Sequence, residues 1–509
     1  MDLGSNTFRL VVFRYRPGGP FHLVDEIRQT VRLAAGAEDG RLRPEAVDRA
    51  ARTAALYAAF CRAGAIDEVD AVATSALREA RNGREATARL TAAGLPVRVI
   101  SSEEEARYGV LGVLNSTTLR DGLVLDVGGG SAQLSRIAGR GMASTVGAPL
   151  GAVRMTEAFL PGRTASKGQL KQLRRHVAQR LDAVGAPGRG EGRVVGQGGT
   201  VRTLAAMDQR GRAYPLDEVH GYRLRRDALD DLIAAMAALP ADRRDRLPGL
   251  KRDRADILLA GAVVVDAVLE RLGVDHLEVA AQGLREGVFY ERFLAPEDPP
   301  LLPDVREASV LNAARRFGYE RAHAEQVVRL ALGLYDGLAA MGLHDPQPVE
   351  REWLRAAGLL HDVGVLVDYN DHHKHGFYLV LNAGLPGFAH RELAMVALLV
   401  RAHRKALATT NGFEAVLEPG DEASLARLAA CLRVAEQLER GRAQVVRRLR
   451  FDAVDGAVRV GVEAEGDPGL AVWSAAQQGV AFERAFGRRL EVAGAVGSPN
   501  PLAALDVEA

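Results

Sequence analysis

The sequence predicts an α/β fold of two lobes with a cleft between them, followed by an all-α domain and a small α+β subdomain. One phrase occurs twice: an apolar strand, an Asp and a turn of small residues, as DLGSN at residues 2–6 and LDVGGGS at residues 125–131. Each copy heads a similar alternation of strand-like and helix-like runs, which is typical of an α/β domain. After PEDPP at residues 296–300 the pattern is helical to about Arg440, and strand-like alternation returns over residues 445–492.

Lobe I is predicted to cover residues 1–117 and to begin with a β-meander. Residues 1–33 alternate in polarity like neighbouring strands, and the turn residues 18–20 divide them. Periodicity then predicts helices at residues 44–63, 75–80 and 101–111, and strands at residues 69–74 and 95–100. At the start of the last helix, Ser102 and Glu105 match the pattern of a capping box.

Lobe II is predicted to cover residues 118–296 and to repeat this order. Its hairpin is followed by a helix, a strand at residues 193–195, another helix and a strand at residues 276–280. The remaining assignments are an all-α domain at residues 303–440, an α+β subdomain at residues 441–495, and a polar, proline-containing tail, expected to be disordered, at residues 496–509.

Composition and charge narrow the class of protein. At 509 residues the chain has room for about three or four domains, and its composition is that of a soluble globular protein. A net charge of +1 steers it neither to nucleic acid nor to a membrane, so neither is an expected partner. The longest apolar run, residues 257–265, is too short to span a bilayer. Cys61 and Cys431 are expected as core thiols, which fits a reducing compartment. No signal peptide is expected, because residue 2 is already the Asp of the first motif. Together these two points predict a cytoplasmic location.

The chemistry is expected at the glycine turns that follow Asp2 and Asp126. Glycine lets backbone N–H groups approach an anion closely, because no Cβ is in the way. A third glycine turn, VGQGGT, occupies residues 195–200. Two facing turns would grip adjacent phosphates, with each Asp holding Mg²⁺ or orienting water. The alternative is that each Asp only shapes its own bend as an Asx turn.

Glu105 and Arg78 are further candidates in lobe I. Glu105 closes an acidic triplet at a helix start, where acids also stabilise the helix dipole without any catalytic role. Arg78 follows Thr74 and Ser75 at a strand end, and ligands of α/β domains bind at such ends. Arg78 is therefore a candidate phosphate ligand, with an ordinary surface cation as the alternative.

Several motifs in the right order and spacing resemble the exopolyphosphatase / guanosine pentaphosphate phosphatase (Ppx/GppA) family. They are DLGSNTFRL at residues 2–10, ISSEEEAR at 100–107, LDVGGGS at 125–131, PGL at 248–250, RADI at 254–257, GLREG at 283–287, LPGF at 385–388 and VRAHRK at 400–405. The resemblance covers nearly the whole chain and is to the long members of the family, which carry a C-terminal HD-like helical domain. It implies that the two lobes are actin-like (ribonuclease H-like).

The resemblance also implies roles for single residues. Glu105, which directly precedes Ala106, is the general base, and Asp126 positions the attacking water and the metal. Asp2 supports the first loop, and Asp2, Asp126 and Glu105 are the expected ligands of Mg²⁺ or another divalent cation. With Arg78 included, the expected phosphate-binding residues are Gly4, Ser5, Asn6, Arg78, Gly128, Gly129, Gly130, Ser131, Gly199 and Thr200.

Two positions depart from the family pattern. The family usually has an acid two residues after the Ser of the GGGS turn, where it is tied to metal binding, and this chain has Gln133. That change leaves the metal affinity open. The family also prefers Gly in the loop before the catalytic Glu, where this chain has Ser102, a residue type that caps helices.

The expected reaction is processive release of terminal orthophosphate from inorganic polyphosphate by in-line attack of water. Removal of the 5′-terminal phosphate of guanosine pentaphosphate is the same chemistry with another leaving group, and the sequence does not separate the two. Basic stretches at residues 403–405, 440–442 and 447–448 could line a polyphosphate channel or be solvated faces. A third alternative is a polyphosphate or alarmone sensor with little turnover. The long members of the family tend to be dimers, so a homodimer is expected.

The helical domain holds a second candidate site. His323, His361 and Asp362 resemble the first three metal ligands of the HD phosphohydrolase superfamily, and Glu436 stands where that pattern has an Asp. Imidazole and carboxylate ligands suit several divalent metals. Further imidazoles in this region belong to His372, His373, His375 and His390. The alternative is a degenerate HD fold, in which His361 and Asp362 are polar residues bonded within a helical core.

Overall fold

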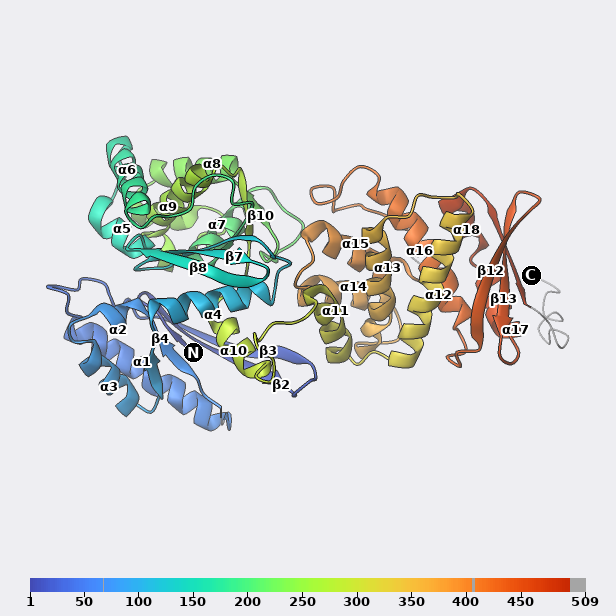
Figure 1. Cartoon of the computed structure of the whole chain (residues 1–509), viewed down its shortest axis with the longest axis horizontal. Coiled ribbons are helices and arrows are strands. Elements are labelled where there is room, and N and C mark those ends of the chain that lie inside the picture. Colours follow the sequence, from blue (N-terminus) through green and yellow to red (C-terminus); the bar gives the residue numbers. More distant parts are fainter. Residues whose placement is uncertain (67, 405–407, 495–509) are drawn as a thin grey trace. The chain divides into compact units, whose positions relative to one another are not determined.

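The computed structural model describes residues 1–66, 68–404 and 408–494. The chain divides into two compact units, Met1–Val305 (unit 1) and Arg306–Ala509 (unit 2), which are described separately (Figure 1). Unit 1 contains two β-sheets, and unit 2 contains a helical bundle and a third sheet. The tail expected at residues 496–509 lies outside the described residues.

The first sheet has the strand order β3-β2-β1-β4-β5. Its strands are β1 (Asp2–Leu3), β2 (Thr7–Tyr15), β3 (Phe21–Thr30), β4 (Ala71–Ala73) and β5 (Val97–Val99). The helices on one face are α1 (Pro44–Ala63), α2 (Ser75–Glu79) and α3 (Gly83–Ala92). The first three strands form the predicted antiparallel meander, and β4 runs parallel to β1. Apolar side chains such as Leu3 and Tyr57 form the core between sheet and helices.

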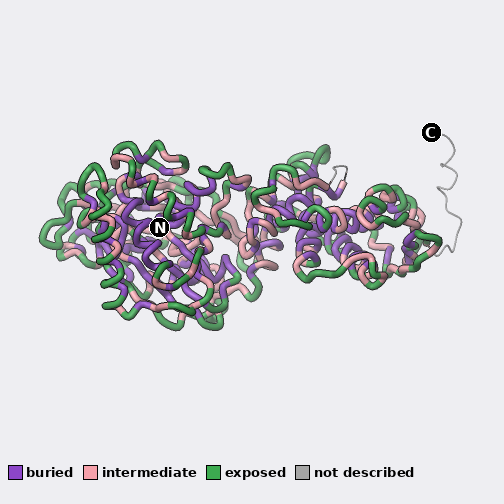
Figure 2. The backbone as a smooth tube through the Cα atoms, turned by 90° about the horizontal axis from the view of Figure 1, so that it is seen from above, coloured by how far each residue is buried: buried purple, intermediate pink, exposed green. Residues whose placement is uncertain are grey.

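The second sheet has the strand order β10-β11-β9-β6-β7-β8. Its strands are β6 (Gly122–Val127), β7 (Ala132–Ala138), β8 (Gly141–Ala148), β9 (Arg193–Gln197), β10 (Arg223–Arg225) and β11 (His276–Val279). The helices that cover one face are α5 (Ala152–Phe159), α6 (Lys167–Ala183), α7 (Gly198–Gly211), α8 (Arg226–Ala238) and α9 (Leu258–Leu272). Alternate side chains of β6, Leu123 and Leu125, point into this core because successive strand residues face opposite ways. Figure 2 shows buried backbone in the interior of both units.

The two sheets of unit 1 repeat one plan, as the near-repeat in the sequence predicted. In each, an antiparallel meander is joined by a parallel strand beside its first strand, β4 next to β1 and β9 next to β6. Asp2 pairs with Arg9 across the first hairpin, and Asp126 pairs with Gln133 at the matching place in the second. Both aspartates therefore lie one residue before the end of the first strand of a hairpin.

Two helices exchange sheets between the lobes. They are α4 (Ser102–Leu114) and α10 (Leu284–Phe293). The sequence of α4 belongs to the predicted lobe I, yet its Val113 packs with Val124 of the second sheet. The sequence of α10 belongs to the predicted lobe II, yet its Val288 packs with Val72 of the first sheet. Figure 1 shows α4 and α10 between the two lobes. The limit between residues 117 and 118 therefore separates the lobes in sequence. In space, each lobe contributes one helix that packs against the sheet of the other lobe.

Unit 2 begins with a bundle of helices and ends with a small mixed segment. Its helices are α11 (Val305–Arg316, of which Val305 counts with unit 1), α12 (Arg321–Ala340), α13 (Pro348–Leu360), α14 (His372–Ala383), α15 (His390–Ala402), α16 (Asp421–Leu438), α17 (Gly469–Ala476) and α18 (Gly479–Phe486). Its sheet has the order β12-β13-β14, with β12 (Val446–Val454), β13 (Ala457–Ala464) and β14 (Arg489–Gly494). The strands β12 and β13 are antiparallel, and β14 is parallel to β13. The bundle followed by an α+β segment confirms the predicted class of this part.

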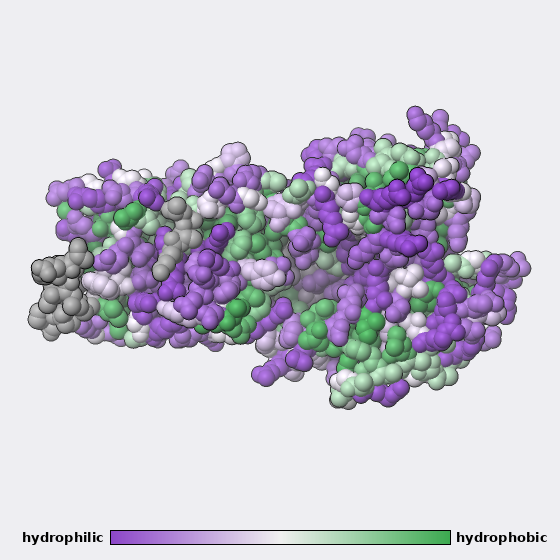
Figure 3. Space-filling model, turned by 180° about the vertical axis from the view of Figure 1, so that it is seen from behind, coloured by the Kyte–Doolittle hydropathy of each residue, from purple (hydrophilic) through white to green (hydrophobic). Residues whose placement is uncertain are grey.

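The surface drawn in Figure 3 is mostly hydrophilic, with hydrophobic residues in smaller areas. No helix among residues 1–66, 68–404 and 408–494 combines the length and the apolar character needed to cross a membrane. Both cysteines, Cys61 and Cys431, are buried and unpaired, as expected for core thiols.

Candidate active site

A cavity between the two sheets of unit 1 collects most of the predicted site residues. The predicted residues that line it are Asp2, Gly4, Ser5, Asn6, Glu105, Asp126, Gly128, Gly129, Gly130, Ser131, Gly199 and Thr200. The cavity has a volume of about 160 Å³. Pockets that enclose drug-sized ligands are larger, at roughly 300–1,000 Å³. This cavity therefore suits a small polar group, such as one end of a longer ligand.

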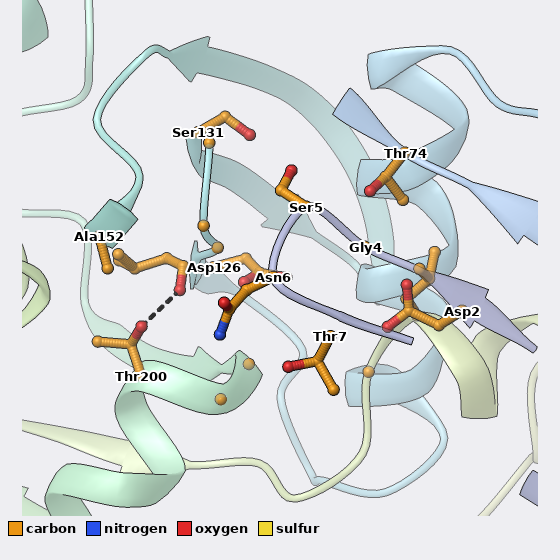
Figure 4. A pocket seen from close by; sticks show the side chains of 18 of the residues that line it. Asp2, Gly4, Ser5, Asn6, Thr7, Thr74, Asp126, Ser131, Ala152 and Thr200 are labelled. Atoms are coloured by element: carbon orange, nitrogen blue, oxygen red, sulfur yellow. Dashed lines mark hydrogen bonds between the residues drawn. The ribbon is translucent and has the colours of Figure 1, made fainter. Parts of the chain in front are cut away.

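Two loops of matching geometry form opposite walls of the cavity. In the first loop, the backbone amide of Gly4 donates to the carbonyl oxygen of Thr7 at 3.2 Å. In the second loop, the backbone amide of Gly128 donates to the carbonyl oxygen of Ser131 at 3.0 Å. Figure 4 shows the first loop with Asp2 and Asp126, which come from different sheets. In the described chain, the Asn6 side-chain nitrogen is buried without a hydrogen-bond partner. Buried donors are almost always paired in proteins, so this amide points to a ligand oxygen.

Glu105 lies on the first turn of α4 and faces the cavity. Its carboxylate accepts a hydrogen bond from Nη1 of Arg78 at 2.8 Å, and its side chain is 19% exposed. Burial raises the pKa of Glu105 to about 7; Arg78 opposes this shift, and Asp126 and Asp2 add to it. A carboxyl group with a pKa near neutral can both accept and release a proton at physiological pH.

The predicted capping box of Ser102 and Glu105 is wrong by one residue. Ser101 caps α4: its side chain accepts from the amide of Glu104 at 3.0 Å, and the Glu104 carboxylate accepts from the amide of Ser101 at 2.8 Å. Both pairs have the same spacing, so the pattern alone did not fix the register. The consequence is functional, because Glu104 is the acid that caps the helix and Glu105 is left to face the cavity.

Arg78 does not line the cavity itself. Its guanidinium donates to the Glu105 carboxylate and, at 3.0 Å, to the carbonyl oxygen of Ile100. The structure therefore places Arg78 as a partner of Glu105, whereas the sequence predicted a phosphate ligand. Sequence position alone brought Arg78 to the correct strand end but did not show which way its side chain turns.

Asp126 is held at the end of β6 by the third glycine turn. Nε2 of Gln197 donates to Oδ2 of Asp126 at 3.1 Å, and the hydroxyl of Thr200 donates to the carbonyl oxygen of Val127 at 2.9 Å. Gly198 has a φ of +85°, and a Cβ there would lie 2.5 Å from Oδ1 of Asp126. Glycine is therefore required at this approach. Burial raises the pKa of Asp126 to about 6, and Arg202 opposes the shift.

Four arginines in the cavity wall were not predicted as ligands. They are Arg9, Arg202, Arg254 and Arg285. Burial, followed by the nearby charges of Arg285 and Arg9, lowers the pKa of Arg202 to about 9. Burial and the charges of Arg28 and Arg9 lower the pKa of Arg254 to about 10. Several cations that repel one another in a buried site favour binding of an anion there.

Sequence motifs contained part of this signal. Arg254 and Arg285 stand in the RADI and GLREG motifs, but no role was assigned to them. Arg9 stands in the DLGSNTFRL motif, and it too was given no role. Arg202 has no neighbouring signal, because it reaches the cavity only when its helix is in place. Gly199 makes room for Arg254, since a Cβ at Gly199 would lie 2.2 Å from Nη2 of Arg254.

The cavity acids fit a magnesium ion that is bound together with phosphate. Burial raises the pKa of Asp2, as it does for Asp126 and Glu105. Among the residues that the structure describes, three metal-ligating atoms lie within 4.8 Å of one another only in unit 2, so these acids form no closed cage. Mg²⁺ usually takes one or two carboxylates and completes its shell with water and substrate phosphate. An oxygen-only donor set of separate carboxylates matches that preference.

Gln133 occupies the position at which the resemblance led us to expect an acid. Its Nε2 lies 3.4 Å from the carbonyl oxygen of Ser102, at the start of the helix that carries Glu105. An amide can donate to this carbonyl, whereas a carboxylate cannot. Compared with an acid at this position, Gln133 removes a negative charge from the cavity wall and adds a contact with α4.

The second predicted site lies within unit 2. His323, His361 and Asp362 bring one ligand atom each within 4.8 Å of one another, and Asp362 forms a second such group with His372 and His403. His403 was not predicted as a ligand; it belongs to the VRAHRK motif, which was interpreted as a basic stretch. The predicted neighbours Glu436, His373, His375 and His390 belong to neither group.

Two facing glycine loops on twin sheets, with partly buried acids and arginines between them, define unit 1 as a phosphate-handling protein of the actin-like class. A model of the Ppx/GppA phosphatase family matches residues 11–295, and a model of domain III of Ppx/GppA phosphatases matches residues 305–465. The chain therefore belongs to the Ppx/GppA phosphatase family, a family of hydrolases.

Solved structures support the same assignment. A Ppx/GppA family member from Aquifex aeolicus is 29% identical, with a TM-score of 0.51, covering 58% of this chain and 97% of that one. An exopolyphosphatase-like protein is 26% identical, with a TM-score of 0.52 and coverage of 58% and 98%. An exopolyphosphatase from Cytophaga hutchinsonii is similar in fold, at 23% identity, with a TM-score of 0.53 and coverage of 57% and 96%.

Proposed function

We propose that the protein is an exopolyphosphatase, which releases terminal orthophosphate processively from inorganic polyphosphate by in-line attack of water. The observation that carries this proposal is Glu105, a partly buried carboxyl group with a pKa of about 7 in a cavity walled by two glycine loops. A general base works best when its pKa lies near the operating pH. Glu105 would take the proton of the attacking water.

The end of the phosphate chain would bind in the cavity. The backbone N–H groups of both loops and the Asn6 amide would bind its terminal oxygens, and the arginines would balance its charge. Mg²⁺ held by Asp2 and Asp126 would neutralise charge on the same oxygens. The leaving group is the next phosphate of the chain, so catalysis consists mainly of positioning and charge stabilisation.

One observation favours polyphosphate over guanosine pentaphosphate. The cavity volume of about 160 Å³ suits a phosphate end, which both ligands carry. No aromatic side chain is among the described residues that line the cavity, so none is available there to stack on guanine. The relative at 26% identity is described as exopolyphosphatase-like, which agrees with this choice.

Phosphate release tests the proposal directly. Long-chain polyphosphate and guanosine pentaphosphate are compared as substrates, each with Mg²⁺ and with chelator. We expect processive release from polyphosphate that needs the metal, and a loss of roughly 10²–10⁴-fold in kcat for Glu105→Gln. Glu104→Gln is the matched control, because Glu104 is the neighbouring acid and belongs to the capping box. This variant is expected to keep kcat close to that of the wild type.

Each other outcome contradicts part of the proposal. Fast release from the nucleotide alone would move the function to alarmone metabolism. Release from neither substrate, together with tight binding of polyphosphate, would favour a sensor with little turnover. Wild-type turnover by a folded Glu105→Gln variant would remove Glu105 from the role of base.

A homodimer and a cytoplasmic location remain predictions from the resemblance and the sequence. Sedimentation velocity of the full chain measures the first, and a mass equal to one chain at micromolar concentration would contradict it. Fractionation of cells that express the chain measures the second.

A further inference from the structure

Four buried imidazoles surround one carboxylate in unit 2. His323 lies on α12, His361 directly follows α13, His372 begins α14 and His403 directly follows α15. Their side chains are at most 5% exposed, and that of Asp362, at the centre, is 16% exposed. Four segments of the bundle thus bring an imidazole ring to one point.

The ring nitrogens and the carboxylate oxygens lie at the spacing of metal ligands. The Nε2 atoms of His323 and His361 are 3.3 Å apart, and those of His372 and His403 are 3.0 Å apart. Oδ1 of Asp362 lies 3.3 to 3.8 Å from three of these nitrogens, and Oδ2 lies 3.7 Å from that of His323. Two ligands bonded to one ion at about 2.1 Å, at angles of about 90–110°, are separated by roughly 3.0–3.4 Å.

In three of the four rings the hydrogen bonds indicate which nitrogen is free. In His361, His372 and His403 the Nδ1 atom lies 2.8, 2.8 and 2.6 Å from the backbone carbonyl oxygen three residues earlier. A carbonyl only accepts, so Nδ1 carries the proton and Nε2 presents a lone pair. This arrangement orients imidazole ligands in metalloproteins.

In these three rings the lone pairs face the interior of the cluster and the carboxylate of Asp362. Two neutral imidazole nitrogens at 3.0 Å, each with its lone pair toward the other, repel one another unless a cation lies between them. Asp362 belongs to both groups of ligands, so one carboxylate can bridge two cations. Nitrogen-rich ligand sets favour ions such as Zn²⁺, Fe²⁺ or Co²⁺ over Mg²⁺.

Arginines stand at the edge of this cluster, and Arg442 also pairs with Glu320. Arg442 donates to Oδ2 of Asp362 at 2.6 Å, and Nη1 of Arg404 lies 3.2 Å from Nδ1 of His372. Arg404 also donates to the hydroxyl of Tyr369 at 3.3 Å, and Arg440 lies 3.7 Å from Glu436. Arginines at the edge of a metal site are suited to bind an oxyanion such as phosphate.

We propose that His323, His361, Asp362, His372 and His403 form a centre for two divalent transition-metal ions bridged by Asp362, with its arginine side open to a phosphate-type oxyanion. One ion is held by His323, His361 and Asp362, and the other by Asp362, His372 and His403. This centre is separate in sequence and in ligand chemistry from the all-oxygen cavity of unit 1. The proposal does not depend on the function proposed for that cavity.

Metal counting tests the centre without any assay of activity. The full chain is stripped with chelator, loaded with Co²⁺, freed of excess ion, and measured by mass spectrometry of the metal and by visible absorption. The geometry predicts about two Co²⁺ ions per chain with nitrogen-type absorption bands. His323→Asn and His403→Asn each lose about one ion, and Asp362→Asn loses both.

The controls separate binding from folding and from the other cavity. His375→Asn, on the same helix as His372 but outside both groups, keeps the wild-type count, and so does Glu105→Gln in unit 1. Circular dichroism of each metal-free variant establishes that it is folded. A count of about one ion per chain would overturn the second ion, and none would overturn the centre.

Inorganic phosphate tests the oxyanion. Added to the Co²⁺-loaded wild type, it is expected to shift the visible bands, and a folded Arg404→Gln variant with the same Co²⁺ count needs more phosphate for the same shift. Bands that ignore phosphate would overturn this part of the proposal, whereas equal sensitivity of the Arg404→Gln variant would remove Arg404 from the anion site.

Discussion

Glu105 depends on its neighbours for its place in the cavity. Glu104 is occupied by the cap of α4 and by Arg98, which donates to it at 2.7 Å. Glu105 follows it on the next position of the helix and turns toward Asp126 and Arg78. Two adjacent acids of the same type thus differ in environment, because one satisfies the end of the helix and the other faces the cavity.

Arg78 sets the pH at which Glu105 becomes ionised. Its positive charge lowers a pKa that burial raises to about 7, so Arg78→Met should raise that pKa further. The base acts as a carboxylate, and its ionised fraction falls as the pH drops below its pKa. A pKa higher by about one lowers this fraction roughly tenfold on the acidic side. The acidic limb of the pH profile of kcat/KM is therefore expected to move to higher pH.

Arg98→Met is the matched control for this prediction. It removes the partner of Glu104 at the same helix start and leaves the contact between Arg78 and Glu105 in place. Its acidic limb should stay where the wild type has it. If both variants share the wild-type limb, another group controls the profile.

The residues of the site divide by how local their signals are. Asp2, Asp126 and their loops could be predicted because strand, acid and turn are consecutive in the sequence. Arg9 and Arg202 could not be predicted as cavity residues. The direction of Arg9 depends on the register of the first hairpin, and that of Arg202 depends on the packing of α7. His403 was missed for a related reason: its basic neighbours suggested a charged surface, whereas the bundle buries its ring beside Asp362.

At the scale of elements, α4 and α10 of unit 1 pack closely against one another. A Cβ at Gly287 would lie 1.9 Å from the backbone oxygen of Tyr108, and a Cβ at Gly112 would lie 2.3 Å from that of Gly283. Glycines on both helices therefore allow the backbones to touch. The helices and strands themselves were largely predictable; α1 has the predicted bounds. The exchange of α4 and α10 between sheets was not, because periodicity says which face is apolar but not which sheet covers it.

Gly287→Ala should force the two helices apart. The added methyl group meets a backbone oxygen that cannot move aside, and such overpacking costs about 1–3 kcal/mol in the free energy of unfolding. Chemical denaturation measures the change. Gly211→Ala, at the end of α7 with open space around it, is the control and should be neutral or stabilising by up to about 1 kcal/mol. Equal stability of the two variants would contradict the close contact.

At the scale of the whole molecule, unit 1 contains everything that the cavity needs. The Aquifex aeolicus family member is covered over 97% of its length by 58% of this chain, so related proteins consist of the two-lobed part alone. The lobes have their own buried cores, and no residue of unit 2 lines the cavity in the described chain.

A fragment of residues 1–304 is therefore expected to fold and to keep phosphate release. We expect cooperative thermal unfolding and a kcat on short polyphosphate within about tenfold of the full chain, because the first turnover uses only unit 1. Calorimetry and phosphate release measure both. A folded fragment without turnover would show that unit 2 supplies part of the active machinery, and the Glu105→Gln fragment controls for residual hydrolysis.

The crossing of α4 and α10 also has a mechanical consequence. Glu105 lies at the N-terminal end of α4, where Arg78 of lobe I donates a hydrogen bond to it. The rest of that helix packs against the sheet of lobe II. A rotation of one lobe against the other would turn about this crossing, and a point near a pivot moves least. The two glycine loops belong to different sheets, so such a rotation would move them apart. If the protein acts on polyphosphate as proposed, the chain could then advance by one phosphate between two cleavage steps, and Glu105 would not have to be repositioned.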